Sequence, residues 1–405
     1  MTSTKSVPDF MNEDFFKNAL ENTLSEKIEI KNLAVEHNTS CGNYCSNIYR
    51  AAVKYATDKN AEDTKEIHLL IKDLFIHMSG SSREYFMYTT LLPALNAILQ
   101  KSQPDKQLSA RLFHAKKGDN ETHVFEDLNA RGYVICNRLV GYNEEETKVV
   151  LSKLAQLHAT SMVFMKEQPK VMAELKEFYF KSEPGIMELL AKLTEDYANY
   201  SSKVVEKWPG YAKIAEKMRK NVGDTFKQKI LKIFPKEQAL VKVLVHADLW
   251  IKNILMLRDA EGPKDAIFVD YQMCFEGSPA LDIHNLFITS VKLDVLKTKR
   301  LELIRHYYDV LRTTLIACDY NRDDIPTLDD ILYEVQRTEF FSYYELVFPF
   351  AQTNLSDKLT EGLGVGDLTE ENNMERTLKD IYSNRRVLDT YAYELRRLDD
   401  LGILD

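Results

Sequence analysis

Apolar and polar residues alternate with the two-residue period of β-strands over the first third of the chain. This alternation predicts five strands, at residues 28–35, 48–55, 66–72, 108–115 and 122–128. Residues 12–25 carry apolar side chains at helical spacing, which predicts a helix ahead of the first strand. A second helix should begin at Arg83 and end near Pro93, because proline interrupts helical hydrogen bonding.

Beyond residue 130 the period changes to that of helices. Residues 144–165 form a clear helical pattern, in which His158 is interpreted as a packed helix residue. Residues 245–272 interrupt the helices with a hairpin-like pattern. The glycine-bearing stretch 354–372 predicts a loop, and residues 374–401 predict one long helix. We therefore expect a lobe boundary near residue 130, with an N-lobe at 1–129 and a C-lobe at 130–405.

Composition excludes several classes of protein. The net charge is −9 and no long basic run occurs, which argues against a nucleic-acid or anionic-membrane partner. The five cysteines are odd in number and scattered, which disfavours a disulfide framework and favours a reducing compartment. The first 15 residues include acidic side chains and lack the apolar run of a signal peptide. No apolar run is long enough to span a membrane, so we expect a cytoplasmic protein.

Two acids and an amide mark the stretch 245–272, which contains H-A-D-L-W-I-K-N, a polar turn and V-D-Y-Q. Asn253 lies five residues after Asp248, and a hairpin would return Asp270 close to Asn253. Phosphoryl transfer needs metal ions to neutralise charge, a carboxylate to orient the hydroxyl, and a fixed nucleotide. Carboxylate and amide oxygens suit Mg²⁺, so Asn253 and Asp270 could both hold it. Taken alone, the motif would occur by chance in many proteins and is also compatible with a buried aspartate pair in any α+β domain.

Residues toward the N-terminus supply candidates for binding a nucleotide. Gly42, Asn43, Tyr44 and Ser46 lie in a polar stretch between two predicted strands, where backbone N–H groups could cradle phosphates. With a single glycine, this stretch could instead be an ordinary hairpin turn.

Lys72 ends the third predicted strand, the position from which kinases contact the α- and β-phosphates. Glu84, on the helix that follows, could pair with Lys72. Each of the two residues taken alone would more commonly be a solvated charge. Glu126, Asp127 and Leu128 end the fifth strand and resemble a linker between lobes, whose backbone would hydrogen-bond an adenine edge. The order of these features along the chain is more specific than any one of them.

The motifs H-A-D-L-W-I-K-N and V-D-Y-Q resemble those of the choline kinase-like and aminoglycoside phosphotransferase group, and most of all the insect ecdysteroid kinase-like family. Trp250 and Gln272 are the most telling residues. Further matching segments are Gly42–Ser46, Glu84–Pro93, Glu126–Leu128, Leu154–Ala159 and Gly277–Asp282. The resemblance implies a bilobal, protein-kinase-like α+β fold, with a small N-lobe built on an antiparallel sheet and a larger, mainly helical C-lobe.

The resemblance also implies roles for individual residues. Asp248 would be the catalytic base, with Asn253 and Asp270 as Mg²⁺ ligands. Lys72 would contact the phosphates of ATP and Glu84 would hold it in place. His246 and Asp282 would buttress the catalytic loop. The chain departs from the family pattern at Ala247, usually glycine, at Lys252, often asparagine, and at Tyr271, usually phenylalanine. None of these departures removes a metal or phosphate ligand, but they bear on loop geometry.

The family resemblance implies an ATP-dependent kinase that phosphorylates a hydroxyl of an ecdysteroid, another lipophilic alcohol or a toxin. A run of aromatic residues between 307 and 350 suits a flat apolar substrate, a choline-type cation, or plain helix core. Two alternatives therefore stay open: a choline or ethanolamine kinase, and a catalytically silent ligand-binding relative. The particular alcohol and the oligomeric state are not specified by the sequence.

Overall fold

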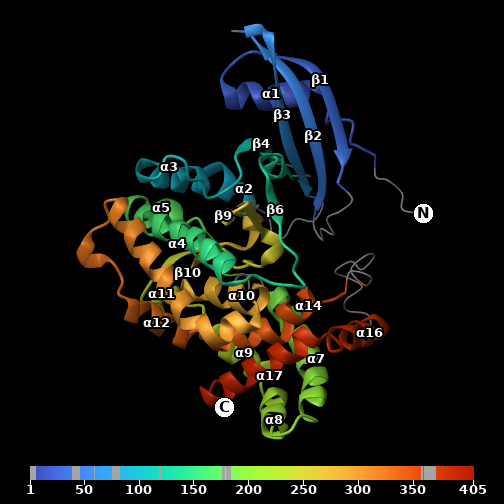
Figure 1. Ribbon diagram of the computed structural model, residues 1–405, viewed down its shortest axis with the longest axis vertical. Coiled ribbons are helices and arrows are strands. Elements are labelled where there is room, and N and C mark those ends of the chain that lie inside the picture. Colours follow the sequence, from blue (N-terminus) through green and yellow to red (C-terminus); the bar gives the residue numbers. More distant parts are fainter. Residues whose placement is uncertain are drawn as a thin grey trace. The chain divides into compact units, whose positions relative to one another are not determined.

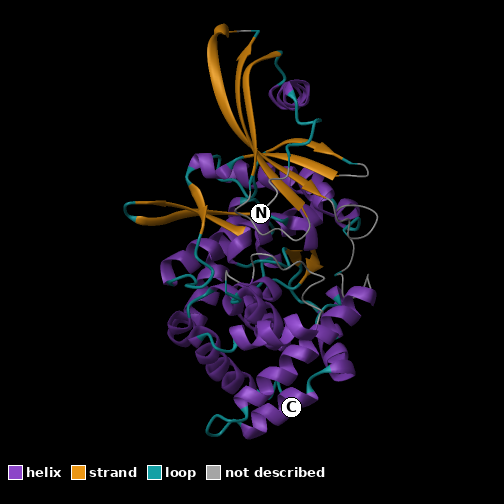
Figure 2. Ribbon diagram, turned by 90° about the vertical axis from the view of Figure 1, so that its right-hand side faces the viewer, coloured by secondary structure: helices purple, strands orange, loops and turns teal. Residues whose placement is uncertain are grey.

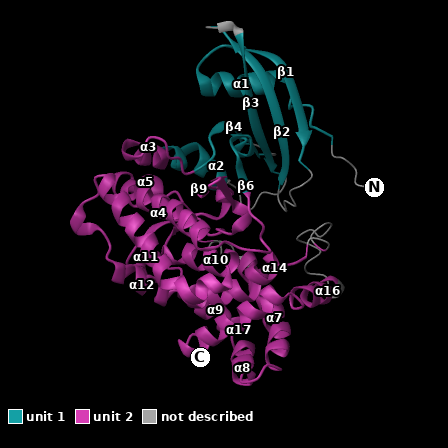
Figure 3. Cartoon of the chain, in the orientation of Figure 1, with its two compact units in different colours: residues 1–93, 109–134 teal, residues 94–108, 135–405 magenta. Residues whose placement is uncertain are grey.

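The computed structural model (Figure 1) describes residues 6–38, 46–58, 60–74, 83–117, 121–175, 178, 184–356, 359 and 371–405. The chain divides into two compact units, residues 1–93 with 109–134, and residues 94–108 with 135–405 (Figure 3). The first unit is built on a β-sheet, and helices dominate the second (Figure 2). The α+β fold class expected from the sequence is confirmed. None of the helices within these ranges is long and apolar enough to cross a bilayer.

The sheet of the first unit has five antiparallel strands in the order β1-β2-β3-β5-β4. Their bounds are Ile28–His37, Ser46–Thr57, Asn60–Leu74, Leu112–Lys116 and Glu121–Glu126 for β1 to β5. All five expected strands are therefore present. The fourth begins later than residue 108, because the backbone of Leu108 is used elsewhere: its N–H donates to Asn96 and its carbonyl accepts from Tyr271.

Helix α1 (Glu13–Leu24) packs against the sheet of the first unit and closes its core (Figure 1). The side chain of Asn12 caps the helix by accepting a hydrogen bond from the N–H of Phe15 at 3.1 Å. Phe16 and Leu20 bury their side chains among alternate strand residues, which include Leu69 and Ile71. Because side chains alternate across a strand, Lys72 lies on the opposite face from Ile71.

The helix expected to end near Pro93 continues past it, so that boundary was wrong. Arg83–Phe86 (α2) leads into a π-helical turn, Met87–Leu91 (η1), and then into α3 (Leu92–Ser102). Proline is tolerated in the first turn of a helix, where its missing N–H is not needed. The π-helical turn resets the hydrogen bonding just before Pro93, so the chain remains helical.

Helices make up most of the second unit. Their bounds are Glu144–Glu167 (α4), Pro169–Met172 (α5), Pro184–Val205 (α7), Ala212–Lys220 (α8), Gly223–Leu231 (α9), Ala280–Ser290 (α10), Leu293–Ala317 (α11), Leu328–Arg337 (α12), Phe340–Glu345 (α13), Ala351–Thr353 (α14), Glu371–Ile381 (α16) and Arg385–Asp400 (α17). A π-helical turn, Leu346–Phe350 (η7), joins α13 to α14. Helix α4 starts with a capping box between Asn143 and Glu146, and α11 packs along it.

The C-terminal segment is two helices, α16 and α17, and not the single long helix expected for residues 374–401. Asn384 explains the break, because its side chain accepts from the N–H of Arg386 and starts a new helix. Ser383 donates from its hydroxyl to the carbonyl of Asp380, which closes the preceding turn. Most of the expected loop at 354–372 lies outside the described ranges.

Short strands and 3₁₀ turns lie between the longer elements from residue 128 onward. The strands are Tyr133–Ile135 (β6), Val243–Val245 (β7), Ile254–Asp259 (β8), Gly262–Phe268 (β9) and Phe275–Gly277 (β10). The 3₁₀ turns are Leu128–Arg131 (η2), Lys236–Gln238 (η3), Ile251–Asn253 (η4), Tyr271–Met273 (η5) and Arg322–Asp324 (η6). Strand β7 pairs with β10, and β8 forms an antiparallel hairpin with β9.

Candidate active site

The β8–β9 hairpin brings Asn253 and Asp270 to the same end of the two strands. Ile254 pairs with Phe268, and the N–H of Val269 donates to the carbonyl of Asn253 at 3.0 Å. Asp270 directly follows Val269, so it lies just after the hairpin and beside Asn253, which lies just before it. The hairpin thus forms between the two residues, as the alternation of the sequence predicts.

Asn253 also binds Asp248. Its Nδ2 donates to the backbone carbonyl of Asp248 at 2.9 Å and to the Oδ2 carboxylate oxygen of the same residue at 2.8 Å. The 3₁₀ turn η4 makes this possible, since the N–H of Asn253 turns back to the carbonyl of Trp250 at 2.8 Å. Asn253 is buried whereas Asp248 is partly exposed. The amide therefore orients a carboxylate that solvent can reach.

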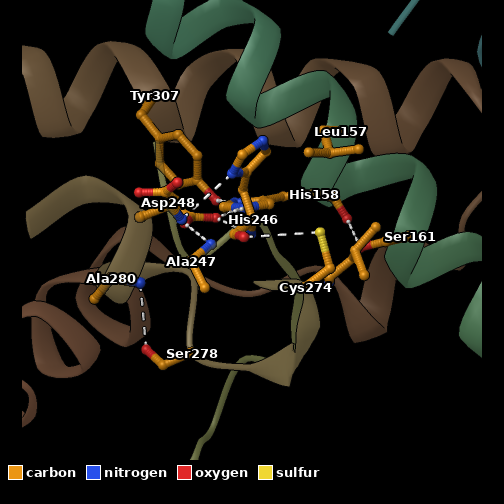
Figure 4. A network of polar contacts seen from close by, with 12 residues as sticks. Leu157, His158, Ser161, His246, Ala247, Asp248, Cys274, Ser278, Ala280 and Tyr307 are labelled. Atoms are coloured by element: carbon orange, nitrogen blue, oxygen red, sulfur yellow. Dashed lines mark hydrogen bonds and ion pairs between the residues drawn. The ribbon is translucent and has the colours of Figure 1, made fainter. Parts of the chain in front are cut away.

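Asp282, in the first turn of α10, holds the backbone just before Asp248. Its Oδ2 accepts from the N–H of His246 at 2.7 Å, and its Oδ1 accepts from the N–H of Ala247 at 2.9 Å. Both carboxylate oxygens are thus used by consecutive backbone donors. Figure 4 shows this network around His246 and Ala247. The buttressing contact expected between Asp282 and the His246 loop is present.

A second anchor of Asp282 was not predicted. His158 of α4 is fully buried and its Nε2 lies 3.1 Å from Oδ2 of Asp282, while its Nδ1 lies 2.7 Å from the hydroxyl of Tyr307 in α11 (Figure 4). A carboxylate only accepts, so Nε2 carries the proton and Nδ1 accepts from Tyr307. The sequence correctly indicates that His158 is a packed helix residue, but it gives no signal for Tyr307, which lies 149 positions away.

The side chain of His246 is a neutral link inside the loop. Burial lowers its pKa, although the charges of Asp282 and Asp270 oppose this effect. Its Nε2 donates to the carbonyl of Val269 at 3.1 Å, and its Nδ1 accepts from the N–H of Asp248 at 3.3 Å. His246 therefore connects the Asp248 loop to the strand end that carries Asp270.

Ala247 occupies the left-handed region, with φ of 67°. Glycine adopts this conformation without cost, whereas a residue with a Cβ atom is strained there. The family pattern of glycine at this position therefore has a physical reason. The chain nevertheless keeps the same backbone turn, because Asp282 holds the N–H of Ala247.

The first unit contains an ion pair between Lys72 of β3 and Glu84 of α2. The Nζ atom lies 2.9 Å from Oε1 and 2.7 Å from Oε2. The two side chains are 12% and 2% exposed, so this pair is not a solvated surface contact. The expected pairing is confirmed.

His123 stands opposite Lys72 on strand β5. Burial, with the charge of Lys72 adding to it, lowers the pKa of His123 to about 3. The imidazole is therefore neutral and does not compete with Lys72 for anions.

The side chains at the end of β5 have structural roles. Glu126 accepts from the N–H of Arg111 at 2.8 Å and from the guanidinium of Arg131 at 2.9 Å. Asp127 caps η2 by accepting from the N–H of Asn129 and lies 3.0 Å from Nε of Arg50. Leu128 is buried. These contacts hold residues 126–128 in place through their side chains. A linker whose backbone binds an adenine edge would require such an arrangement.

The predicted phosphate loop is only partly visible. Ser46 is buried at the start of β2, where it pairs with Leu74. Gly42, Asn43 and Tyr44 lie outside the described residues.

Asn253 and Asp270 suit a magnesium ion by their donor chemistry. Nδ2 of Asn253 points to Asp248, so its Oδ1 is the atom that could bind a metal, and Asp270 adds a carboxylate. Among the described residues no group of three or more His, Cys, Asp or Glu could hold a metal by itself. Mg²⁺ commonly binds one or two protein oxygens together with water and phosphate oxygens, so this pair fits the ion when a nucleotide is bound.

The aromatic run between 307 and 350 is mostly helix core. Six of its members are buried: Tyr307, Phe340, Phe341, Tyr343, Tyr344 and Phe350. Tyr308 and Phe348 are partly exposed. These aromatic residues therefore do not distinguish between substrates.

Comparison with known proteins found similar solved structures and one matching family. The solved structures found by the comparison include an ethanolamine kinase of Plasmodium vivax, 14% identical, covering 92% of this chain and 89% of that one, with a TM-score of 0.45. They also include a putative fructosamine-3-kinase of Haemophilus somnus, 12% identical over 91% of this chain and 96% of that one, with a TM-score of 0.36. The GDP complex of an aminoglycoside 2′-phosphotransferase is 12% identical over 92% and 98%, with a TM-score of 0.39.

The comparison with curated proteins gave no match. The profile of the ecdysteroid kinase-like family matches residues 40–320, a span that contains Lys72, Glu84, Asp248, Asn253, Asp270 and Asp282. The chain belongs to the ecdysteroid kinase-like family.

Proposed function

We propose that the protein is an ATP-dependent O-phosphotransferase that acts on a hydroxyl of a small molecule, an ecdysteroid or a similar lipophilic alcohol. The observation that carries this proposal is the partly exposed carboxylate of Asp248, held by Nδ2 of Asn253 at 2.8 Å. Membership of the ecdysteroid kinase-like family supports the reaction class.

Asp248 is the proposed base. The acceptor hydroxyl oxygen attacks the γ-phosphorus of ATP, its proton passes to the Asp248 carboxylate, and ADP leaves. Phosphoryl transfer depends on positioning, and the hydrogen bonds of Asn253 and Asp282 supply it around Asp248. A Mg²⁺ ion held by Asn253 and Asp270 would neutralise phosphate charge when bound.

Lys72 is the proposed contact to the α- and β-phosphates, and the ion pair with Glu84 fixes its ammonium group. The backbone of Glu126 to Leu128 is the proposed adenine contact. Gly42, Asn43, Tyr44 and Ser46 are the proposed phosphate loop.

A phosphorylation screen tests the proposal. Purified protein with Mg-ATP is incubated with a library of hydroxylated steroids, xenobiotic alcohols, choline and ethanolamine, and products are read by a mass increase of one phosphoryl group. A steroid or related alcohol should be phosphorylated, and Asp248→Asn should lower the rate by orders of magnitude. Asp259→Asn, the same change at an exposed position of the β8–β9 hairpin, is the matched control and should retain activity.

Nucleotide binding separates the roles of the two aspartates. Asp270→Asn should weaken Mg-ATP affinity more than Asp248→Asn, because only Asp270 is a proposed metal ligand. Equal losses would contradict this division. If only choline or ethanolamine were phosphorylated, the substrate would be a small amino alcohol and not a lipophilic alcohol. Nucleotide binding without any product would instead favour a silent ligand-binding protein.

A further inference from the structure

Helix α10 carries two polar side chains on one face. Asp282 holds the loop before Asp248, and Asn285 lies one turn further along. The helix packs against η4, which carries Asn253, and against α13 and η7. Nδ2 of Asn285 donates to Oε2 of Glu345, the last residue of α13, at 2.8 Å. Asn285 and Glu345 are 4% and 2% exposed.

Glu345 is a neutral carboxylic acid at pH 7. Burial raises its pKa to about 8, and the negative charges of Asp248 and Asp282 add to the effect, whereas the hydrogen bond from Asn285 opposes it. The ring of His284, also on α10, binds Ser342 and Thr338. Helix α10 links Glu345 to the loop of the proposed base, because Asn285 binds Glu345 and Asp282, one turn earlier, binds Ala247.

Asn285 also has an unused hydrogen-bonding atom. Its Oδ1 is buried and has no hydrogen-bond partner among the residues that the structure describes. Buried polar atoms are nearly always paired, and exceptions point to a missing ligand or water. Immediately after Glu345 the helix changes to the π-helical turn η7, which contains Pro349. Such turns are frequent at functional sites.

We infer that Asn285 and Glu345 form a specificity subsite for a second, uncharged hydroxyl of the acceptor, so that the preferred substrate is a diol. The inference rests on the proposed phosphotransferase function. The amide oxygen of Asn285 accepts from this hydroxyl, and the protonated carboxyl of Glu345 donates to its oxygen. The first hydroxyl is the one presented to Asp248.

A cationic amine suits this subsite less well. An ammonium group would need an ionised Glu345, but a third negative charge close to Asp248 and Asp282 is unfavourable. An alcohol without the second hydroxyl would leave Asn285 and Glu345 unsatisfied. A site built to hydrogen-bond a hydroxyl rejects the analogue that lacks it more strongly than an apolar pocket rejects a missing methylene.

The test uses three steroid probes: a vicinal diol, the matching mono-alcohol, and the analogue with an amine in place of the second hydroxyl. Affinity is measured by calorimetry with the full chain and a non-hydrolysable Mg-ATP analogue, and phosphorylation is measured separately. The diol should bind at least tenfold more tightly than the mono-alcohol at pH 7. Glu345→Gln, which stays neutral and hydrogen-bonding, should keep the preference within about threefold, whereas Glu345→Ala and Asn285→Ala should abolish it.

Ser342→Ala, on the same helix but bonded to His284, is the control for packing and should keep the preference. The titration of Glu345 is read directly by ¹³C NMR of protein labelled at glutamate carboxyls, with the resonance assigned by its absence in Glu345→Gln. The inference would be overturned if the amine bound most tightly of the three probes and Glu345→Gln lost that binding. Equal binding of diol and mono-alcohol would also overturn it. Preferential binding of the diol without phosphorylation would refute the proposed kinase activity and support the subsite. Phosphorylation without a preference for the diol would support the kinase activity and refute the subsite.

Discussion

The carboxylate of Asp282 holds the N–H of Ala247 at 2.9 Å, and Ala247 has a left-handed backbone. This hydrogen bond thus maintains a backbone conformation that alanine disfavours. The turn places Asp248 next in the chain, so strain at Ala247 bears directly on the proposed base.

Ala247→Gly should stabilise the protein slightly. The left-handed region costs a residue with a Cβ atom about 1–2 kcal/mol. Glycine offsets part of this gain, roughly 0.5–1 kcal/mol, through its larger freedom in the unfolded chain. We expect a net rise of about 0.5 kcal/mol in the free energy of unfolding, measured in urea. Ala247→Val should lose at least about 1 kcal/mol, because a branched side chain is more strained there. Equal stability of the two variants would refute strain at this position.

Asp282→Asn should destabilise the protein by about 2–3 kcal/mol. Both carboxylate oxygens accept from backbone N–H groups, at His246 and Ala247. An asparagine has a single oxygen, so its NH₂ group would face a buried donor. Asp294→Asn, at the start of α11, is the exposed control and should be neutral. Chemical denaturation of both variants measures the difference, and a neutral Asp282→Asn would contradict the buttressing role.

Tyr307→Phe should cost about 1–2 kcal/mol in stability, since it leaves Nδ1 of His158 buried without its donor. The aromatic ring is kept, so packing changes little. The matched control is Tyr308→Phe at the neighbouring, partly exposed position, which should be nearly neutral. If phosphotransfer is detected, its rate should also fall in Tyr307→Phe, because His158, which binds Asp282, loses an orienting contact. Thermal unfolding of the two variants compares them, and equal losses would show that the hydroxyl of Tyr307 does not matter.

Local patterns along the chain predicted much of the fold. Alternation predicted five strands and the β8–β9 hairpin, because one face of each strand is buried. The pairing of Lys72 with Glu84 followed from their order along the chain. The break before α17 was not predicted, because Asn384 caps a helix inside a continuous helical pattern. The passage through Pro93 was missed for a similar reason, since a π-helical turn leaves no periodic signal.

Long-range partners could not be predicted from spacing. His158 was expected to be a packed residue, and it is, but its partners Asp282 and Tyr307 lie 124 and 149 positions further along the chain. Glu345 lies in an aromatic helix core and lacks any motif around it. Its proximity to the Asp248 loop depends on how α10 packs against α13, which only the folded chain determines.

Lys72→Met and Glu84→Gln should each weaken Mg-ATP binding by about tenfold or more if the ion pair positions the ammonium group for phosphate. The double variant should bind no worse than Lys72→Met, because contacting residues that act as one unit are not additive. Lys65→Met, at an exposed position of the same strand, is the control. Calorimetric titration measures all four proteins. Additive losses would show that Glu84 acts independently of Lys72.

Glu345 should make the protein less stable as pH rises from about 4.5 to about 8. Its pKa is about 8 in the folded protein, against 4.5 for an ordinary glutamate, so the folded chain holds a proton that the unfolded chain releases. Unfolding is therefore favoured increasingly across this interval, and the effect becomes constant above it. The full shift corresponds to about 5 kcal/mol. Glu345→Gln cannot ionise and keeps an acceptor for Asn285, so it should be the more stable protein by up to this amount at pH 8. The difference should shrink at pH 6.5 and nearly vanish at pH 4.5. Urea unfolding of both proteins at the three pH values measures it, and parallel stability profiles would show that Glu345 titrates normally.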